Sequence, residues 1–129
     1  MKIGVLMKTV TAILLAFLWI SISEFARNAF ILKTHWTKHY ESLGLIFPSS
    51  PINGAIWGIW SLAFSITIYT ISKKFSLLET VFIAWFAGFV LMWLVIGNMG
   101  VLPISILYFA IPLSILEVYL ATFIIKKLS

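Results

Sequence analysis

Four long apolar stretches separated by short polar segments make up most of this chain. A helix that crosses a lipid bilayer needs about 20 mostly apolar residues. The pattern therefore predicts membrane-spanning helices at about residues 8–32, 52–72, 77–96 and 103–125. Residues 33–51, KTHWTKHYESLGLIFPSSP, form a polar loop that we expect at the membrane interface, because aromatic rings such as those it contains collect at the headgroup layer.

The connections between the last three stretches contain only a few residues each. Lys73 and Lys74 lie in the first of these connections, and residues 97–100 (GNMG) form the second. Short connections place consecutive helices side by side and antiparallel. The fold class that follows is all-α, a four-helix transmembrane bundle in which residues 1–129 form a single integral membrane domain.

The first apolar stretch has a second interpretation, as a secretory signal peptide. Its basic start (MKIGVLMK), its apolar run and the small serines in residues 21–23 are all typical of such a signal. We expect a retained helix instead. The following residues, EFARNAFIL, continue the helical pattern without glycine or proline.

The composition supports a membrane protein and excludes several other classes. Of the 129 residues, 62% are apolar and 10% are charged, whereas a soluble domain has roughly 45–50% apolar and about 25% charged residues. A domain this small cannot hide that apolar excess inside itself, so the lipid bilayer is the expected partner. The absence of cysteine excludes disulfides and thiolate metal sites. We expect no nucleic-acid partner, because no long basic patch is interleaved with aromatic residues.

The basic residues predict an orientation in a cytoplasmic membrane, here a bacterial inner membrane. Cytoplasmic loops of membrane proteins are enriched in lysine and arginine. With both termini in the cytoplasm, the inner side would hold six lysines: Lys2, Lys8, Lys73, Lys74, Lys126 and Lys127. The outer side would hold three basic residues: Arg27, Lys33 and Lys38.

Small residues recur along the second span and predict a packing seam. They are Gly54, Gly58, Ser61, Ser65 and Ser72. Small side chains let helix backbones approach closely in lipid, where apolar burial gives little drive for association. The seam could join helices of one chain or form a homo-oligomer.

Glu117 is the most unusual residue of the fourth span. It lies nine residues before Lys126, or roughly 13 Å at about 1.5 Å per residue, which places it near the middle of the membrane. Ionisable residues at that depth are rare and usually face a bundle interior or a water-filled cavity. We expect no lysine or arginine at the same depth. The carboxyl group should then be neutral unless water reaches it.

Two serines join Glu117 as candidates for an ion- or proton-binding site. Ser114 lies on the same helical face as Glu117, and Ser65 lies at matching depth in the second span. Pro112 cannot donate to the carbonyl of Tyr108, so this free carbonyl could contribute to the same site. The alternative is a neutral glutamate that only hydrogen-bonds across helices to hold the bundle.

A second polar group is expected at the opposite membrane face from the six lysines. It comprises Glu24, Arg27, Asn28, His35, His39, Asn53 and Asn98. These residues could line a pocket that is open to the outside, with Glu24 and Arg27 paired. Ordinary helix ends facing water would give a similar pattern. Histidines four residues apart on a helix can share a metal ion, but no third ligand follows at a fixed spacing. We therefore predict neither a metal site nor a cofactor.

Several enzyme signatures are missing from the sequence. It contains no glycine-rich phosphate loop, no G-x-S-x-G serine elbow and no H-E-x-x-H zinc motif. We therefore expect that the protein is not an enzyme and assign no catalytic residue. Lipid-headgroup chemistry by Glu24 and Arg27 with His35 or His39 ranks third among the functional hypotheses.

Three fragments carry a resemblance that covers most of the chain. They are EFARN (24–28), PINGAIWGIWS (51–61) and AIPLSILE (110–117). Together they resemble small uncharacterised bacterial four-helix integral membrane proteins, which implies the fold and no activity. The small multidrug resistance transporters are similar in size, but their essential glutamate is in the first helix. Here the deep glutamate, Glu117, is in the fourth span.

Two functions from different classes are consistent with these patterns. The first is proton- or ion-coupled transport of a small solute, with Glu117 as the coupling residue. The second is a structural or accessory membrane subunit, which binds a partner or itself through the small-residue seams.

Overall fold

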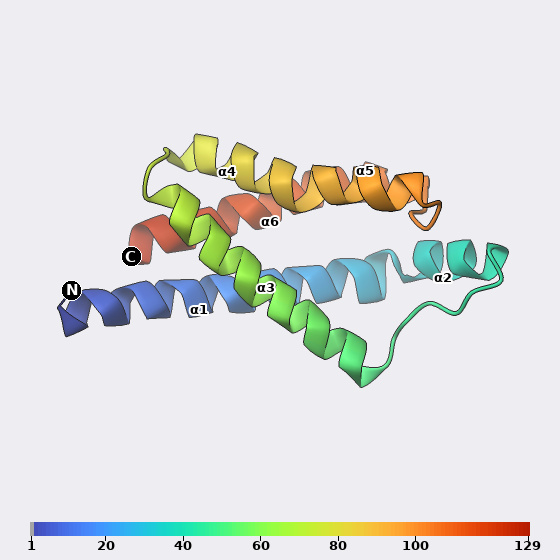
Figure 1. Ribbon diagram of the computed structural model, residues 1–129, viewed down its shortest axis with the longest axis horizontal. Coiled ribbons are helices and arrows are strands. Elements are labelled where there is room, and N and C mark those ends of the chain that lie inside the picture. The colour runs from blue at the N-terminus through green and yellow to red at the C-terminus, as the bar shows by residue number, and fades with distance from the viewer. Residues whose placement is uncertain (1) are drawn as a thin grey trace.

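The computed structural model describes residues 2–129 and shows an all-α protein (Figure 1). Four of its helical segments are long and apolar enough to cross a membrane: Ile3–Ile31, Pro51–Ser72, Leu77–Asn98 and Ile104–Leu128. The prediction of four apolar spanning-length helices is confirmed. The outward sides of these segments carry many exposed apolar residues, among them Leu18, Phe82 and Leu94, as expected for helices that face lipid.

The four long segments are built from several helical elements. The first contains α1 (Ile3–Phe25) and the π-helical η1 (Ala26–Ile31), and the second is α3 (Pro51–Ser72). The third contains α4 (Leu77–Trp85), the π-helical η2 (Phe86–Val90) and α5 (Leu91–Asn98). The fourth contains the 3₁₀ turn η3 (Ile104–Ile106) and α6 (Leu107–Leu128). A short helix, α2 (Lys33–Ser42), follows the first segment.

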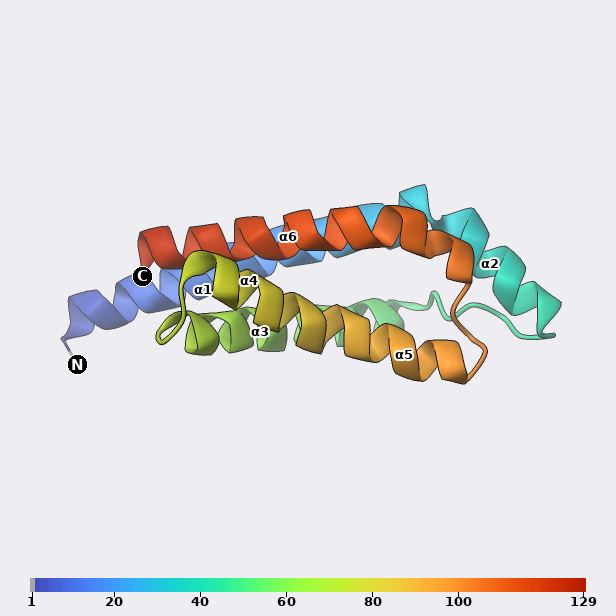
Figure 2. The same ribbon diagram turned by 90° about the horizontal axis from the view of Figure 1, so that it is seen from above.

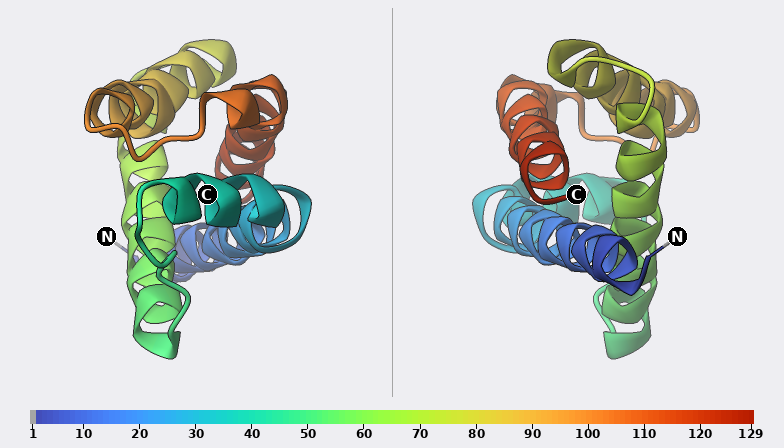
Figure 3. Two further views of the ribbon diagram at one scale, coloured as in Figure 1. Left: turned by 90° about the vertical axis from the view of Figure 1, so that its right-hand side faces the viewer. Right: turned by 90° about the vertical axis from the view of Figure 1, so that its left-hand side faces the viewer.

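The four long segments form a bundle in which neighbours in the chain are antiparallel (Figure 1, Figure 2). Seen end-on, α1 lies between α3 and α6, and α4 with α5 lies across from α1 (Figure 3). Both ends of the chain lie at one end of the bundle together with the α3–α4 turn (Figure 1). We call this the basic end, because it holds the six lysines named above. The opposite end, which carries α2, is called the α2 end.

Two helices begin with a reciprocal pair of polar side chains. At the start of α3, the backbone N–H of Ser50 donates to Asn53 Oδ1 at 3.1 Å. At the start of α4, the N–H of Glu79 donates to Ser76 Oγ at 3.2 Å and the N–H of Ser76 donates to Glu79 Oε1 at 3.1 Å. Such pairs satisfy backbone donors that the first helical turn leaves free. Asn53 therefore has a local structural role.

The expected loop at residues 33–51 is partly helical. Its first ten residues form α2, which has no buried residue, and the chain turns at Gly44, whose φ of 71° favours glycine. The fourth segment begins at Ile104, close to the predicted start at about residue 103, but its first turn is not α-helical. The α-helix begins at Leu107 rather than near Pro103, because Pro103 is extended and a 3₁₀ turn follows it.

The small-residue face of α3 divides into two parts. Ser61, Ser65 and Ser72 are buried, and Ser65 Oγ donates to the carbonyl of Ile13 in α1 at 2.7 Å. Gly54 and Gly58 have nothing within 4 Å of an added Cβ. Because α3 crosses α1 obliquely (Figure 1), only the second half of this face packs against α1. The first half borders open space.

An aromatic cluster fills the bundle between α3 and the third segment. Phe64 stacks on Trp60 at a centroid distance of 4.9 Å and meets the edge of Phe89 at 5.7 Å. Gly88 lies against the same ring. A Cβ built on Gly88 would be 2.6 Å from Cε1 of Phe64. The close approach of η2 to α3 therefore requires glycine at this position.

Replacing Gly88 with alanine should destabilise the bundle. The added methyl group would displace a ring that Trp60 and Phe89 already hold, and overpacking of this kind costs roughly 1–3 kcal/mol. Gly54→Ala is the matched control, because it adds the same methyl group where no atom is near. Titration with denaturing detergent should show a loss of stability for Gly88→Ala alone. Equal stabilities of the two variants would contradict the packing described here.

Candidate charged cluster and adjoining cavity

Three charged side chains meet inside the bundle, at the junction of α1, η1 and α6. Arg27 Nη2 lies 2.5 Å from Glu24 Oε1, and Arg27 Nη1 lies 3.3 Å from Glu117 Oε1. We call Glu24, Arg27 and Glu117 the charged cluster. Glu24 and Arg27 were expected in the outer polar group, and Glu117 was expected deep in the fourth span. The cluster brings these two groups together.

The expectation that Glu117 has no basic partner is wrong. The position of a residue along its helix fixes the depth of its backbone, but a long side chain can reach several ångströms beyond it. Arginine has a long flexible stem, and Arg27 extends it into the bundle rather than toward the surface. Its side chain is only 5% exposed.

The π-helical segments bring Arg27 and an aromatic ring together. In η1 the N–H of Leu32 donates to the carbonyl of Arg27, five residues earlier, at 2.8 Å. This wide turn replaces the usual α-helical bonding just where Arg27 enters the bundle. The second wide turn, η2, holds Phe89, whose ring centroid is 5.5 Å from Arg27 Cζ. The guanidinium thus has a carboxylate on two sides and an aromatic face on a third, an arrangement that favours its charge.

The cluster is almost fully removed from solvent. The exposed fractions are 5% for Glu24, 4% for Arg27 and 0% for Glu117. Buried charges are costly unless opposite charges and hydrogen bonds compensate them. With both carboxylates ionised, two negative charges face one positive charge. The cluster therefore holds one uncompensated negative charge or one extra proton.

The two carboxyl groups differ in how fully they are satisfied. Glu24 Oε2 accepts from Asn28 Nδ2 at 3.1 Å. Glu117 Oε2 is buried and has no hydrogen-bond partner among residues 2–129. Trp19 in α1 instead donates its indole N–H to the backbone carbonyl of Glu117 at 2.9 Å. A buried carboxyl oxygen without a partner favours Glu117 as the group that takes the extra proton.

A chain of hydrogen bonds connects the cluster to α2. Asn28 donates from Nδ2 to Glu24, and its Oδ1 accepts from Trp36 Nε1 at 3.1 Å. Trp36 lies 5.5 Å from Phe47 between ring centroids, and Tyr40 lies 5.1 Å from the same ring. The loop after α2 is thus held by an aromatic contact that also touches the hydrogen-bond chain.

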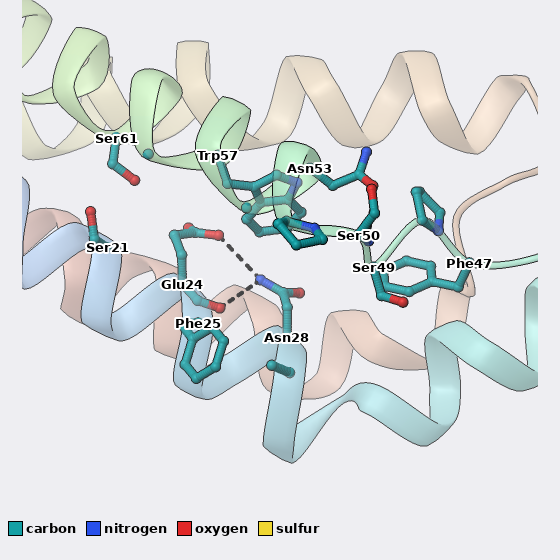
Figure 4. Close-up of a pocket in the computed structure, with 15 residues that line it drawn as sticks. Ser21, Glu24, Phe25, Asn28, Phe47, Ser49, Ser50, Asn53, Trp57 and Ser61 are labelled. Carbon is teal, nitrogen blue, oxygen red and sulfur yellow. Dashed lines mark hydrogen bonds between the residues drawn. The ribbon is translucent and has the colours of Figure 1, made fainter.

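A cavity of about 540 Å³ lies beside the charged cluster, between the first segment and the N-terminal half of α3 (Figure 4). Its lining comes from α1 and η1, from the loop before α3, and from α3 itself: Ser21, Glu24, Phe25, Asn28, Ala29, Phe47, Pro48, Ser49, Ser50, Pro51, Asn53, Gly54, Trp57, Gly58 and Ser61. Glu24 is the one charged residue in this lining. The cavity opens at the surface, where Phe25 and Trp57 are exposed.

The two serines predicted to join Glu117 have other partners. Ser114 Oγ accepts from Trp85 Nε1 at 2.9 Å and donates to the carbonyl of Ile111 at 3.0 Å. Ser65 bonds to α1, as described above. The structure therefore does not bring Ser65 or Ser114 to the Glu117 carboxyl group.

The carbonyl of Tyr108 does not join Glu117 either. The helix α6 runs through Pro112 without a break, and Tyr108 precedes Glu117 by nine residues. Nine residues are about two and a half turns of α-helix, so the two residues lie on opposite faces. Tyr108 is exposed, whereas Glu117 is fully buried.

The predicted outer polar group is only partly assembled. Glu24, Arg27 and Asn28 contact one another directly. His35 Nδ1 lies 3.0 Å from Ser105 Oγ, and His39 Nε2 donates to the carbonyl of Gly100 at 2.8 Å. The histidines thus fix α2 to the connection between α5 and α6.

The remaining members of that group lie apart from the charged cluster. Asn53 lines the cavity and bonds to Ser50, and Asn98 is exposed at the end of α5. Within residues 2–129, no three histidine, aspartate or glutamate side chains gather as metal ligands would.

The cavity residues Ser21 and Trp57 were not predicted from the sequence. Nor were three aromatic residues around the charged cluster: Trp19, Trp36 and Phe89. Their aromatic side chains look like ordinary membrane-helix residues. The spacing of Trp36 eight residues after Asn28 gives no signal either, because eight residues of continuous α-helix rise about 12 Å. The chain bends at Leu32, between η1 and α2, and the two side chains meet across this bend.

Arg27 should contribute far more to stability than the Glu117 carboxylate charge. Arg27→Met leaves two buried carboxyl groups without a counter-charge, and breaking a buried pair in this way costs roughly 3–5 kcal/mol. Glu117→Gln leaves the Glu24–Arg27 pair in place and should cost at most about 1 kcal/mol. Unfolding in mixed micelles would measure both. Similar losses in the two variants would show that the cluster does not depend on the guanidinium.

The comparisons with known proteins add no assignment to this geometry. No family model matches the chain, and the comparisons with curated proteins and with solved structures find no match. The functional interpretation therefore depends on the contacts of the charged cluster and the cavity.

Proposed function

We propose that this chain is a multi-pass protein of the cell membrane that moves a small solute in exchange for a proton. One observation carries the proposal: Glu24 lines the cavity and shares the guanidinium of Arg27 with the buried Glu117. A solute at Glu24 and a proton at Glu117 would therefore act on the same positive charge.

The coupling follows from charge balance in a buried site. When Glu117 holds a proton, Glu24 and Arg27 balance each other and the cluster is neutral. When Glu117 loses its proton, the cluster carries one negative charge, which is costly away from water. Anything bound at Glu24 that changes this balance changes the proton affinity of Glu117. That link is what an exchanger needs.

A second function is supported by the same contacts. Arg27 and Trp19 both reach from the first segment to Glu117 in α6, so the cluster could serve only to clamp these helices together. The chain would then be an accessory membrane subunit, and the proton on Glu117 would have no role. Neither alternative requires catalysis, and we propose that the protein is not an enzyme.

Solute-dependent proton movement distinguishes the two functions. Proteoliposomes that contain a pH-sensitive dye would be exposed in turn to small amines, neutral solutes and carboxylic acids. We expect at least one class to drive proton movement in the wild-type protein. Glu117→Gln should reduce that movement at least tenfold, because an amide side chain neither takes up nor releases a proton near neutral pH.

Glu79→Gln is the matched control for this experiment. It removes the same charge at an exposed helix start, and glutamine can replace glutamate in that capping arrangement. Its proton movement should equal that of the wild type. Wild-type proton movement in Glu117→Gln, or none in the wild type with any solute class, would favour the accessory subunit.

The six lysines of the basic end support an orientation with that end in the cytoplasm. The α2 end, and with it the cavity beside Glu24, would then face the other side of the membrane. A cysteine introduced at Lys38 should react with a membrane-impermeant maleimide in intact cells, whereas one at Lys74 should react only after lysis. The reverse labelling pattern would invert the orientation.

A further inference from the structure

The charge of the cavity selects among possible solutes. Its lining contains one carboxylate, Glu24, and no lysine, arginine or histidine. Arg27 lies behind Glu24, outside the lining, and is held by both glutamates. With both carboxyl groups ionised, the cluster has an excess of one negative charge. A cation at the cavity side of Glu24 would balance this charge, whereas an anion would increase the imbalance.

The walls of the cavity select for an apolar body attached to that cation. Phe25, Phe47 and Trp57 supply aromatic surface, and Pro48 and Pro51 add apolar surface without backbone donors. Aromatic faces attract organic cations and stabilise them where water is excluded. Gly54 and Gly58 leave open space along α3, so a ligand can lie flat against this helix.

One polar group in the cavity has no partner in the protein. Ser21 Oγ is buried and makes no hydrogen bond within residues 2–129. It lies one helical turn before Glu24 on the same wall (Figure 4). A buried hydroxyl without a partner is unfavourable, so Ser21 gives this wall a second polar group beside Glu24.

We infer that the cavity between α1 and α3 binds an amphipathic organic monocation, whose charged group lies at Glu24 and whose apolar body lies against Trp57. The inference names the class of solute for the proposed function. Only the release of a proton on binding rests on that function. Binding of the cation makes the cluster neutral with Glu117 ionised, so the proton of Glu117 is released as the cation enters.

The charged groups of the cluster come from three elements. Glu24 belongs to α1, Arg27 to η1 and Glu117 to α6. The contacts from the other elements are uncharged. They come from Phe89 of η2 and, through Asn28, from Trp36 of α2. No further ionisable side chain of residues 2–129 forms an ion pair with either carboxylate, so proton and cation compete within this cluster alone.

Three probes of one shape test the charge preference in detergent-purified protein or nanodiscs. They are phenethyltrimethylammonium, its neutral isostere (3,3-dimethylbutyl)benzene, and the anion 3-phenylpropionate. Calorimetry should show that the cation binds at least tenfold more tightly than either of the others, after subtraction of partitioning into empty nanodiscs. Binding of the neutral or anionic probe as tightly as the cation would overturn the inference.

Two variants locate the binding site. Glu24→Gln should abolish the preference for the cation, whereas the control Glu79→Gln should keep it. Because Glu24→Gln also removes a buried ion pair, Gly58→Leu provides an independent variant. It fills the cavity from a position with open space and leaves the charged cluster intact. Wild-type cation affinity in Gly58→Leu would place the site elsewhere and overturn the inference.

Proton release separates this inference from the proposed function. Calorimetry in two buffers with different heats of ionisation should show up to one proton released per cation bound, and none in Glu117→Gln. Tight and selective cation binding without proton release would support the ligand class and contradict the exchanger. Proton movement driven only by neutral solutes or acids would support the exchanger and contradict the cationic ligand class.

Discussion

The pairing of one guanidinium with two carboxylates inside an apolar bundle is the interaction on which the arrangement of this protein depends. Arg27 joins the end of the first segment to α6, and its charge rests on the ring of Phe89 from the third segment. Three of the four long segments are therefore tied at one point. A buried ionic group is not a strong source of stability when compared with apolar packing. Helices packed in another arrangement would leave these buried charges unpaired, which is costly.

The position of α3 leaves a cavity beside the charged cluster. Serines in the second half of α3 lie close against α1, while the glycines of the first half border the cavity. One helix thus provides both a packing face and a cavity wall because it crosses α1 obliquely (Figure 1). Without that crossing, α3 would cover Glu24, and the cavity beside it would be closed.

Much of the fold could be predicted from the sequence, but the site could be predicted only in fragments. Apolar length is a one-dimensional property, so the four long helices and their antiparallel order follow from the pattern. The short spacing from Glu24 to Arg27 and Asn28 also predicts their contact, because neighbours at three and four residues share a helical face. The partner of Glu117 could not be predicted in this way. It depends on the direction of one long side chain from a different helix.

The local departures from regular helix were also invisible in the sequence. Neither η1 nor η2 contains a proline, and nothing in ARNAFI or FAGFV distinguishes a wide turn from an ordinary one. Pro112 is the reverse case, because a proline suggests a break and α6 nevertheless continues through it. The serines show the same limit. Ser65 and Ser114 were expected near Glu117, yet each bonds to a different partner.

Each of the two π-helical turns, η1 and η2, accommodates one residue more than an α-helical turn would. If such a turn tightened to α-helical bonding, the chain beyond it would rotate by about 100° and shift by about 1.5 Å. In η1 that movement would turn α2 relative to α1, and in η2 it would turn α5 relative to α4. Both turns meet at the guanidinium of Arg27. The charge balance of the cluster and the winding of two helices are therefore linked at a single side chain.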